Sequence, residues 1–321
     1  MNITFRLDSG NISQIGSGHL YRALKLAKII KKNAYKRAKI YFAISNLTKK
    51  YERKIIKKNK FKIINVPKKN LDIKKEVKDI SFNKPKIIIF DQLNTNKKLI
   101  ISLKKTGAKI ISFDDLGSGS KYTDLTINSL VKKTKYRNCY YGYDYLIFNK
   151  IKKIKVKKNI KNIFLFFGRY DQKKLTLKFI NFIKKLNNNF TFHIVVFNKI
   201  KLKNKKNIKI YYKPINFNKI LQKSDMAITS GGLTMIESLN AGIPTIASVQ
   251  FLHQKRNIEI LSKHKILKSH LPQSFFSERK FIEVFKSLCK NFNERKRLSY
   301  QSKKNINNLG EKKILKLIRK I

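Results

Sequence analysis

The sequence has little cysteine, few acidic residues and no long apolar run, and each shortage excludes a class of protein. Among 321 residues the cysteines are Cys139 and Cys289, and two isolated thiols make neither a disulfide scaffold nor a metal site. No stretch reaches the ~18 uncharged apolar residues that a membrane span needs. Met1–Leu7 is predicted to be a strand and lacks the basic flank and cleavage site of a signal peptide. We therefore expect a cytoplasmic protein without a metal or another cofactor.

The shortage of acidic residues leaves a formal net charge of +57, from 75 Lys and Arg against 18 Asp and Glu. Such basicity is typical of proteins that bind nucleic acid or anionic membranes. Here, however, the lysines are spread along the whole chain together with many Asn and Ile residues. A/T-rich codons produce this composition. The aromatic residues lie inside apolar runs such as Ile163–Phe167, whereas nucleic-acid modules expose them among their charges. We expect no specific nucleic-acid partner and at most weak attraction to an anionic membrane surface; the oligomeric state stays open.

Short apolar runs alternate with amphipathic segments, which predicts βαβ units and mainly parallel sheets. One series of strands is expected at Ile3–Leu7, Ile40–Ile44, Phe61–Val66, Ile87–Phe90, Lys109–Phe113 and Leu125–Ile127. A second series is expected at Ile163–Phe167, Phe190–Val196, Ile208–Tyr212, Met226–Thr229 and Thr245–Ser248. We predict two Rossmann-like doubly wound domains, residues 1–150 and 151–321, that face a cleft and are joined by a linker at Lys150–Asn159. The tail, Glu278–Phe292 and Glu311–Ile321, is predicted to be helical; its return to the first domain is left open.

The loop after the first strand combines glycines with a histidine at the start of a helix. Glycines permit close approach of the backbone to a ligand, and free N–H groups at a helix start favour an anion. The positive end of the helix dipole disfavours an imidazolium at His19, and a neutral imidazole suits a general base. The alternative is a tight turn with His19 as an incidental residue. The candidate ligand-binding residues of this loop are Asp8, Gly16, Gly18 and Arg22.

Acidic residues also follow two further strands of the first domain. Asp91 comes directly after Ile87–Phe90, and Asp114 and Asp115 come after Lys109–Phe113. Because ligands bind at the carboxyl ends of strands in open α/β sheets, these carboxylates are expected to bind ligand hydroxyls or to orient the histidine. Capping of the next helix is the alternative. Both interpretations stay open for Asp91, whereas Asp114 and Asp115 favour the functional one.

The strongest pattern of the second domain is a strand that ends in Ser-Gly-Gly and enters a helix. Backbone N–H groups and the helix N-terminus there suit a diphosphate. Glu237, one turn along the helix, has the chemistry to bond both hydroxyls of a ribose. An ordinary strand–turn–helix is the alternative. The residues expected to contact the nucleotide are Ser230, Gly231, Gly232, Leu233, Thr234, Glu237, and, after the next strand, His253 and Gln254.

Together these segments resemble the GT-B superfamily, whose C-terminal domains bind UDP and which includes the N-acetylglucosaminyl transferase of lipid II synthesis. Ser230–Pro244 is similar to its nucleotide-binding pattern. In the first domain, Gly16–Arg22, Ser112–Asp115 and Asp124–Asn128 resemble the UDP-2,4-diacetamido-2,4,6-trideoxy-β-L-altropyranose hydrolases of pseudaminic acid biosynthesis. Relatives once labelled spore-coat polysaccharide biosynthesis proteins share these segments. The resemblance implies a GT-B fold and covers nearly the whole chain.

The resemblance also implies a reaction in which water attacks the anomeric carbon and UDP leaves, with His19 as the base. The family's Phe-Gly-Gly-x-Asp motif implies that Gly168 and Asp171 contact the nucleotide, although Arg169 replaces its second glycine. The segment Gly142–Asn149 lacks the arginine of another family motif. These two departures leave the sugar open. The alternatives are a GT-B glycosyltransferase that uses a UDP-sugar and a non-enzymatic basic binding protein.

Overall fold

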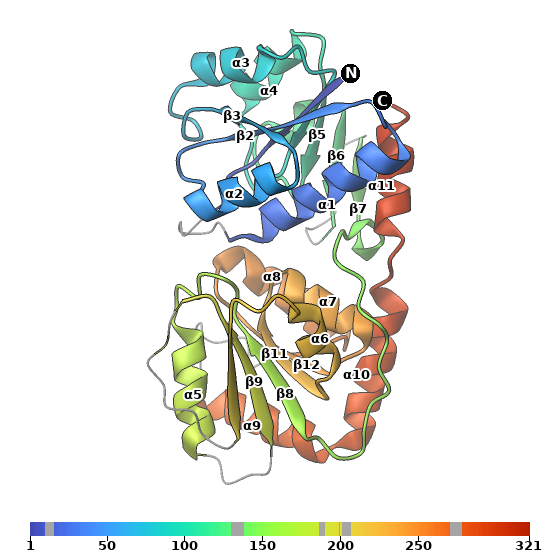
Figure 1. Ribbon diagram of the computed structural model, residues 1–321. Coiled ribbons are helices and arrows are strands. Elements are labelled where there is room, and N and C mark those ends of the chain that lie inside the picture. Colours follow the sequence, from blue (N-terminus) through green and yellow to red (C-terminus); the bar gives the residue numbers. More distant parts are fainter. Residues whose placement is uncertain (10–15, 130–137, 186–189, 199, 201–206, 270–277) are drawn as a thin grey trace. The chain divides into compact units, whose positions relative to one another are not determined.

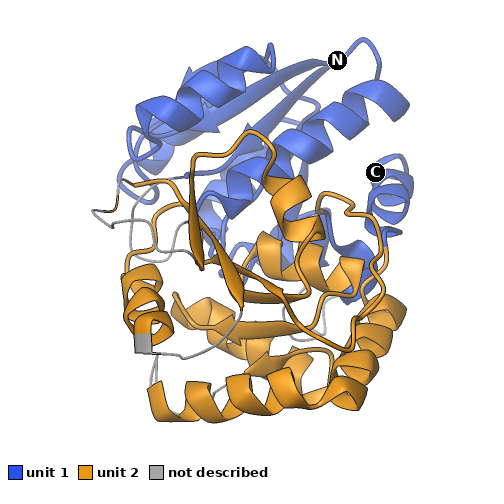
Figure 2. Cartoon of the chain, turned by 60° about the horizontal axis from the view of Figure 1, so that its bottom comes forward, with its two compact units in different colours: residues 1–147, 308–321 blue, residues 148–307 orange. Residues whose placement is uncertain are grey.

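The structure is a computed structural model that describes residues 1–9, 16–129, 138–185, 190–198, 200, 207–269 and 278–321. The chain forms two compact units. Unit 1 contains Met1–Ile147 and Asn308–Ile321, and unit 2 contains Phe148–Asn307 (Figure 2).

Unit 1 is built on a seven-stranded parallel sheet of order β3-β2-β1-β4-β5-β6-β7 (Figure 1). Its strands are β1 (Asn2–Arg6), β2 (Lys39–Ile44), β3 (Lys62–Asn65), β4 (Ile87–Phe90), β5 (Lys109–Phe113), β6 (Leu125–Asn128) and β7 (Cys139–Tyr141). Chain order reverses between β1 and β4, which pair in register from Ile3 opposite Ile87. That reversal is the topological switch point, where doubly wound sheets bind ligands.

Helices cover both faces of this sheet because successive strand residues point to opposite sides. The helices are α1 (Gly18–Asn33), α2 (Lys50–Lys58), α3 (Ile73–Ser81), α4 (Lys97–Lys104) and α11 (Gly310–Ile318). On one face Ile87 and Ile89 of β4 share a core with α1, α2 and α11. On the other face Ile88 and Phe90 pack with α3 and α4. Both cores are apolar, so burial of β4 on two sides explains its continuous apolar sequence.

Unit 2 repeats the plan with a six-stranded parallel sheet of order β10-β9-β8-β11-β12-β13. Its strands are β8 (Asn162–Phe166), β9 (Thr191–Val196), β10 (Ile208–Tyr212), β11 (Met226–Ser230), β12 (Thr245–Ser248) and β13 (Lys268–Ser269). Its helices are α5 (Leu175–Lys185), α6 (Phe217–Gln222), α7 (Leu233–Ala241), α8 (Leu252–Lys263), α9 (Glu278–Lys290) and α10 (Phe292–Asn305). Here the switch point lies between β8 and β11. The prediction of two doubly wound domains is confirmed for the described residues.

The division of the chain differs from the boundaries expected at residues 150 and 151. The segment expected as a linker belongs to unit 2, because Ile151 is buried and the Ile154 N–H donates to the Ala241 carbonyl at 2.9 Å. The tail, assigned to the second domain, is shared between the units. Its last helix, α11, belongs to unit 1 because Ile314 and Ile318 complete the core beside α1.

Among the described residues, two strands and one α-helix were not expected from the sequence. The strands β7 and β13 are three and two residues long, too short for an alternating pattern. The helix α10 is also new, since the expected helix Glu278–Phe292 ends at Lys290 and a second one follows. The sequence of α10 is polar nearly all round. Its buried side includes Arg295, whose guanidinium donates to the carbonyls of Leu288, Cys289, Lys157 and Lys158.

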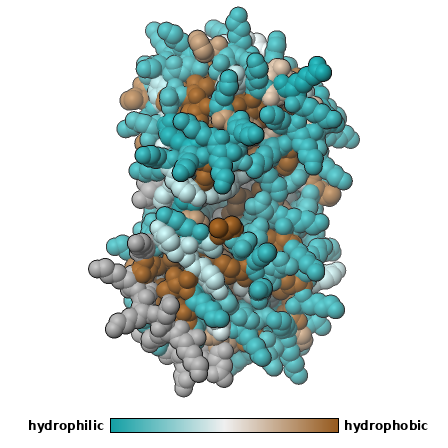
Figure 3. Space-filling view, in the orientation of Figure 1, coloured by the Kyte–Doolittle hydropathy of each residue, from teal (hydrophilic) through white to brown (hydrophobic). Residues whose placement is uncertain are grey.

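Hydrophilic side chains cover much of each unit on the face shown in Figure 3. Exposed lysines occur on helices of both units, for example Lys57 of α2, Lys178 of α5 and Lys286 of α9. Among the described helices, none is both long enough and apolar enough to span a bilayer.

Gly242 ends α7 in the left-handed conformation, with φ of +77°, which most side chains adopt only at a cost. A Cβ at this position would lie 1.9 Å from Lys303 Cε, whose Nζ donates to the Ile154 carbonyl. We expect Gly242→Ala to lower the free energy of unfolding by about 1–3 kcal/mol in a urea titration. Gly107→Ala is the matched control, because φ is +82° there and nothing lies within 4 Å. Equal losses in the two variants would show that the Lys303 contact contributes nothing.

Candidate functional site

The unit 1 switch point brings together residues that lie far apart in the sequence. The loop after β1 leads into α1 and carries His19, and the end of β4 carries Asp91. Nδ1 of His19 lies 2.6 Å from Oδ1 of Asp91, although 72 positions separate the two residues. The His19 side chain is 15% exposed and that of Asp91 only 2%. The pairing therefore fixes the imidazole at the carboxyl edge of the sheet with limited access to solvent.

Arg22, one turn beyond His19 on α1, joins two carboxylates. Its Nε donates to Oδ2 of Asp91 at 2.8 Å and its Nη2 to Oδ1 at 2.6 Å. Its Nη1 donates to Asp114, which follows β5 in the left-handed conformation with φ of +47°. Oδ1 of Asp114 also accepts from the Ser129 backbone N–H at 2.8 Å and hydroxyl at 3.1 Å. We call His19, Arg22, Asp91 and Asp114 the His19 cluster.

Burial and charge act in opposite directions on the pKa values of Asp91 and Arg22. Burial raises the pKa of Asp91, but Arg22 and His19 outweigh it and hold this pKa at about 2. Burial likewise lowers the pKa of Arg22, but Asp91 and Asp114 outweigh it and raise it. Since the pKa of Asp91 is depressed, its stabilising effect is present above the ordinary value of 3.8 and is lost as the pH falls through about 2. Asp91 is thus ionised at neutral pH and accepts the Nδ1 proton, which leaves Nε2 of a neutral His19 ring as the acceptor.

Asp8 belongs to a separate buried network. It accepts from the Arg6 guanidinium at 2.9 Å and from the Ser45 backbone N–H at 2.9 Å. Arg6 is fully buried and also donates to Glu76 at 2.5 Å. Gln92, next to Asp91, donates to Asp8 at 3.5 Å. The contacts of Asp8 thus tie the loops after β1, β2 and β4 together, and a direct contact of Asp8 with ligand stays a prediction.

Asp115 is next to Asp114 in the chain, but it forms its hydrogen bonds with residues outside the His19 cluster. Its carboxylate accepts from the backbone N–H groups of Thr95 and Gly117, each at 2.9 Å. Burial raises its pKa in spite of these bonds. Neither Asp91 nor Asp115 caps α4, since Asn96 does so by accepting from the Lys98 N–H. Asp115 therefore anchors the loop after β5.

The glycines before His19 form the entrance to α1. A Cβ at Gly16 would meet nothing within 4 Å, and Gly18 is the first residue of α1. Ser17, at the N-cap position, makes no capping hydrogen bond with its side chain. The start of this helix thus offers backbone N–H groups beside His19.

The unit 2 switch point is formed by the loops after β8 and β11. Gly168 has φ of +95°, and its Cβ position lies 3.9 Å from Ser230 Oγ at the end of β11. A side chain at Gly231 would lie 2.9 Å from Gln254 Cβ and Ile258 Cδ1 of α8, so only glycine permits this close packing. Gly232 is the N-cap of α7 and makes no side-chain cap. Leu233 and Thr234 follow in its first turn, half-buried.

Glu237 lies one turn into α7 and is 5% exposed. Its Oε1 accepts from the Asn149 backbone N–H at 3.2 Å. The carboxylate therefore holds the start of the chain segment that enters unit 2, on the helix whose N-terminus the Ser-Gly-Gly turn forms.

Asp171 forms hydrogen bonds with the backbone at the start of α5. It accepts from the backbone N–H groups of Leu175 and Thr176 at the start of α5, at 2.9 and 2.8 Å. Gln250 also donates to it at 2.6 Å and to the Phe167 carbonyl at 2.8 Å, which ties the end of β12 to the loop after β8. Gln254 in turn accepts from the Gln250 backbone N–H at 3.1 Å.

The sequence analysis did not predict that Gln250 and Ser129 bond to the candidate site residues Asp171 and Asp114. The sequence could have indicated only that each is a polar residue shortly after a strand. His253 stacks on Phe251 with ring centroids 5.7 Å apart. The Arg169 guanidinium lies 4.2 Å from the centroid of the Phe197 ring.

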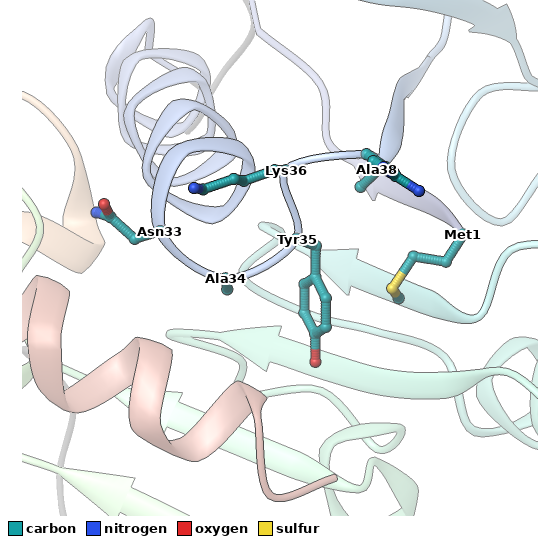
Figure 4. A pocket seen from close by; sticks show the side chains of 7 residues that line it. Met1, Asn33, Ala34, Tyr35, Lys36 and Ala38 are labelled. Carbon is teal, nitrogen blue, oxygen red and sulfur yellow. The ribbon is translucent and has the colours of Figure 1, made fainter.

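Two surface hollows lie away from these residues. One, of about 380 Å³, is lined by residues around the end of α1, including Asn33, Tyr35 and Lys36, and by Met1 before β1 (Figure 4). It is therefore at the amino end of β1, whereas His19 follows the carboxyl end. The other, of about 560 Å³, lies beside Lys104, Lys121 and Tyr122. Within the described ranges, no group of three or more His, Cys, Asp and Glu side chains is arranged to hold a metal ion.

Comparison with known proteins gives two relatives by sequence, and no family model matches the chain. An uncharacterised protein of Methanocaldococcus jannaschii is 32% identical and aligns with 80% of this chain and 58% of its own length. The spore coat polysaccharide biosynthesis protein SpsG of Bacillus subtilis is 26% identical over 56% of this chain and 60% of its own length. The chain thus spans about three fifths of each of these relatives.

Solved structures share the fold at low sequence identity. MurG of Acinetobacter baumannii superposes with a TM-score of 0.75 at 13% identity, covering 100% of this chain and 99% of that one. The MnaA protein of S. aureus, in a structure with UDP, gives a TM-score of 0.67 at 9% identity, covering 99% and 96%. With two all-parallel doubly wound sheets, the chain has the GT-B-type fold.

Proposed function

We propose that the protein hydrolyses a UDP-linked diacetamido-trideoxyhexose at its anomeric carbon, releasing UDP and the free sugar for nonulosonate and surface polysaccharide biosynthesis. The observation that carries this proposal is the contact of His19 Nδ1 with the ionised Asp91, whose two carboxylate oxygens both accept hydrogen bonds from Arg22. An oriented imidazole with its Nε2 available is the arrangement that general-base catalysis requires. The relative SpsG, a polysaccharide biosynthesis protein by name, agrees with this class of reaction.

In the proposed reaction, His19 Nε2 takes a proton from a water molecule while the water oxygen forms a bond to the anomeric carbon. The bond between that carbon and the β-phosphate oxygen breaks, and its electron pair leaves with UDP. The imidazolium then returns its proton to solvent. Asp91 stabilises the transient imidazolium by charge and keeps the ring in one orientation. Asp114, Asp115 and Asp8 remain candidates for contacts with the sugar.

We propose that unit 2 holds the nucleotide. The N-terminus of α7 offers backbone N–H groups and the positive end of a helix dipole to the diphosphate, next to the hydroxyls of Ser230 and Thr234. Glu237 on the same helix is the candidate ribose ligand, and Gly168 allows the backbone after β8 to approach the phosphates. The structure of MnaA with UDP, which shares this fold, supports a nucleotide ligand.

A glycosyltransferase is the second candidate, and the fold shared with CalG4, the calicheamicin glycosyltransferase, favours it. The same His19 and Asp91 pair would then deprotonate an acceptor hydroxyl in place of water, and UDP would leave in the same way. The two reactions differ only in the nucleophile, so the acceptor decides between them.

Incubation with a panel of UDP-sugars, with and without acceptors, tests the function directly. We expect UDP release without an acceptor, because a positioned water suffices for hydrolysis. In H₂¹⁸O the label is expected on the sugar, since attack at carbon leaves the phosphate oxygens of UDP untouched; mass spectrometry of both products measures this. Label on UDP would instead show attack at phosphorus. UDP release that depends on an acceptor would establish the transferase.

A further inference from the structure

Helix α3 carries an exposed apolar side chain at each of its ends (Figure 1). Leu71 precedes the N-cap residue Asp72 and is 74% exposed, and Phe82 follows the last helical residue and is 83% exposed. A single exposed apolar residue is common on protein surfaces, whereas apolar residues that gather at one place mark an interaction site. The helix between them is nine residues long, so one partner surface can cover both side chains.

Three exposed lysines, Lys74, Lys75 and Lys78, lie between these two apolar residues in the chain. Counted from Leu71, Lys75 and Lys78 stand at i+4 and i+7 and Phe82 at i+11, which is the spacing of one helix face. The buried residues of the helix fall on its other side. We call these five residues the α3 face.

The charged residues around the α3 face leave positive charge in excess. Asp72 caps the helix by accepting from a backbone N–H, Glu76 is fully buried, and Asp79 is half-buried. Residues 68–86 contain seven lysines against these three carboxylates. The strand β3 and the helix α4, which contact α3, contain no acidic residue. The α3 face is therefore complementary to an anionic surface.

We propose that the α3 face docks on an anionic lipid bilayer. Leu71 and Phe82 then enter the boundary between the headgroups and the acyl chains, and the lysines contact lipid phosphates, which is the arrangement of an interfacial helix. The apolar stems of the lysines lie along this boundary while their ammonium groups stay in water. Because two apolar side chains and three lysines bury little surface, the docking is peripheral and reversible.

Other partners match the α3 face less well than a bilayer does. A second copy of this chain would present the same lysines, and like charges repel. A nucleic acid attracts lysines, but its bases stack on aromatic rings, and Leu71 has none. An acidic protein surface pairs with lysines, yet its carboxylates give Leu71 and Phe82 no apolar contact. A bilayer offers both kinds of contact.

The chain contains no tryptophan, so Phe82→Trp gives the α3 face a single fluorescent reporter. The probe is vesicles of phosphatidylglycerol and phosphatidylcholine at about 0.15 M salt. We expect the emission to move to shorter wavelength and to be quenched by brominated acyl chains, because the indole enters the boundary. Ile215→Trp is the matched control, since Ile215 is fully exposed in unit 2; its emission is expected to stay unchanged.

Further changes in the Phe82→Trp protein separate the contribution of charge from that of apolar contact. Lys74→Gln, Lys75→Gln and Lys78→Gln together are expected to weaken vesicle binding by about 100-fold, at about fivefold for each lysine. Leu71→Ser is expected to weaken it by about 3- to 10-fold, because an apolar side chain no longer leaves water. Vesicle sedimentation measures both effects and needs no substrate, so the result is independent of the test for UDP release.

Several outcomes would overturn the inference. Vesicle binding without a shift in Phe82→Trp would show that charge on another face holds the bilayer. An equal shift in Ile215→Trp would show insertion without a preferred face, and an absence of vesicle binding would exclude docking altogether. A shift that grows with protein concentration in the absence of vesicles would assign the α3 face to a second copy of the chain. A shift with duplex DNA but not with vesicles would assign it to nucleic acid.

Discussion

His19→Asn is expected to lower kcat for UDP release by about 10²–10⁴-fold, the usual cost of losing a positioned base. An asparagine side chain can still bond to Asp91, so the cluster keeps its packing, but it has no atom that accepts a proton at neutral pH. UDP is expected to raise the melting temperature of the variant as much as that of the wild type, because the proposed nucleotide residues lie in unit 2. Steady-state kinetics and thermal unfolding measure the two effects.

His264→Asn is the matched control for this substitution. His264 is exposed at the end of α8, far along the chain from the loop after β1, and its replacement is expected to leave kcat unchanged. A His19→Asn enzyme with near-normal kcat would remove His19 from the chemistry and leave the transfer or hydrolysis to another group.

Glu237→Ala is expected to remove most of the stabilisation that UDP gives. A ligand that binds only the folded state adds about 2.7 kcal/mol at a concentration of one hundred times its Kd. The loss of a ribose ligand weakens binding, so the shift in melting temperature with UDP should shrink sharply. Thermal unfolding over a series of UDP concentrations measures this.

Glu237→Gln distinguishes a lost ligand contact from a damaged fold. Glu237 also accepts from the Asn149 N–H, and glutamine keeps an acceptor for that bond. We expect Glu237→Gln to retain the melting temperature of the free protein yet to respond weakly to UDP, because a ribose hydroxyl bonds more strongly to a charged acceptor. An unchanged response to UDP in both variants would exclude Glu237 from the nucleotide site.

The architecture could be read from the sequence because the central strands are buried on both faces. Ile87–Phe90 and Lys109–Phe113 are β4 and β5 with the predicted bounds. The polar residues on either side of each continuous apolar run fix where the strand begins and ends. The helix α10 could not be predicted in this way. Arg295 is fully buried there and bonds to a carbonyl that precedes the helix. Such a tertiary contact of a charged residue cannot be predicted from the spacing of apolar residues.

The candidate site could be predicted in part. The rule that ligands bind at a switch point places His19 and Asp91 at one edge of the sheet, and the structure shows their contact. The sequence did not distinguish Asp114 from Asp115, because both follow β5. The left-handed conformation of Asp114 directs it to Arg22, while Asp115 bonds to Thr95 and Gly117. Such backbone choices depend on contacts between distant loops, and the roles of these residues in binding stay predictions.

The position of α11 has a consequence for the order in which the chain can fold during synthesis. Residues 148–307 of unit 2 are continuous, so every contact of that unit is available before α11 has been translated. Unit 1 is translated earlier but lacks Ile314, Leu315 and Ile318, and the apolar surface that they cover beside α1 stays exposed until α11 has been translated. Domains usually complete in order from the N-terminus. Here unit 1 precedes unit 2 but is completed after it, and for that interval its open core is a surface on which nascent chains can associate.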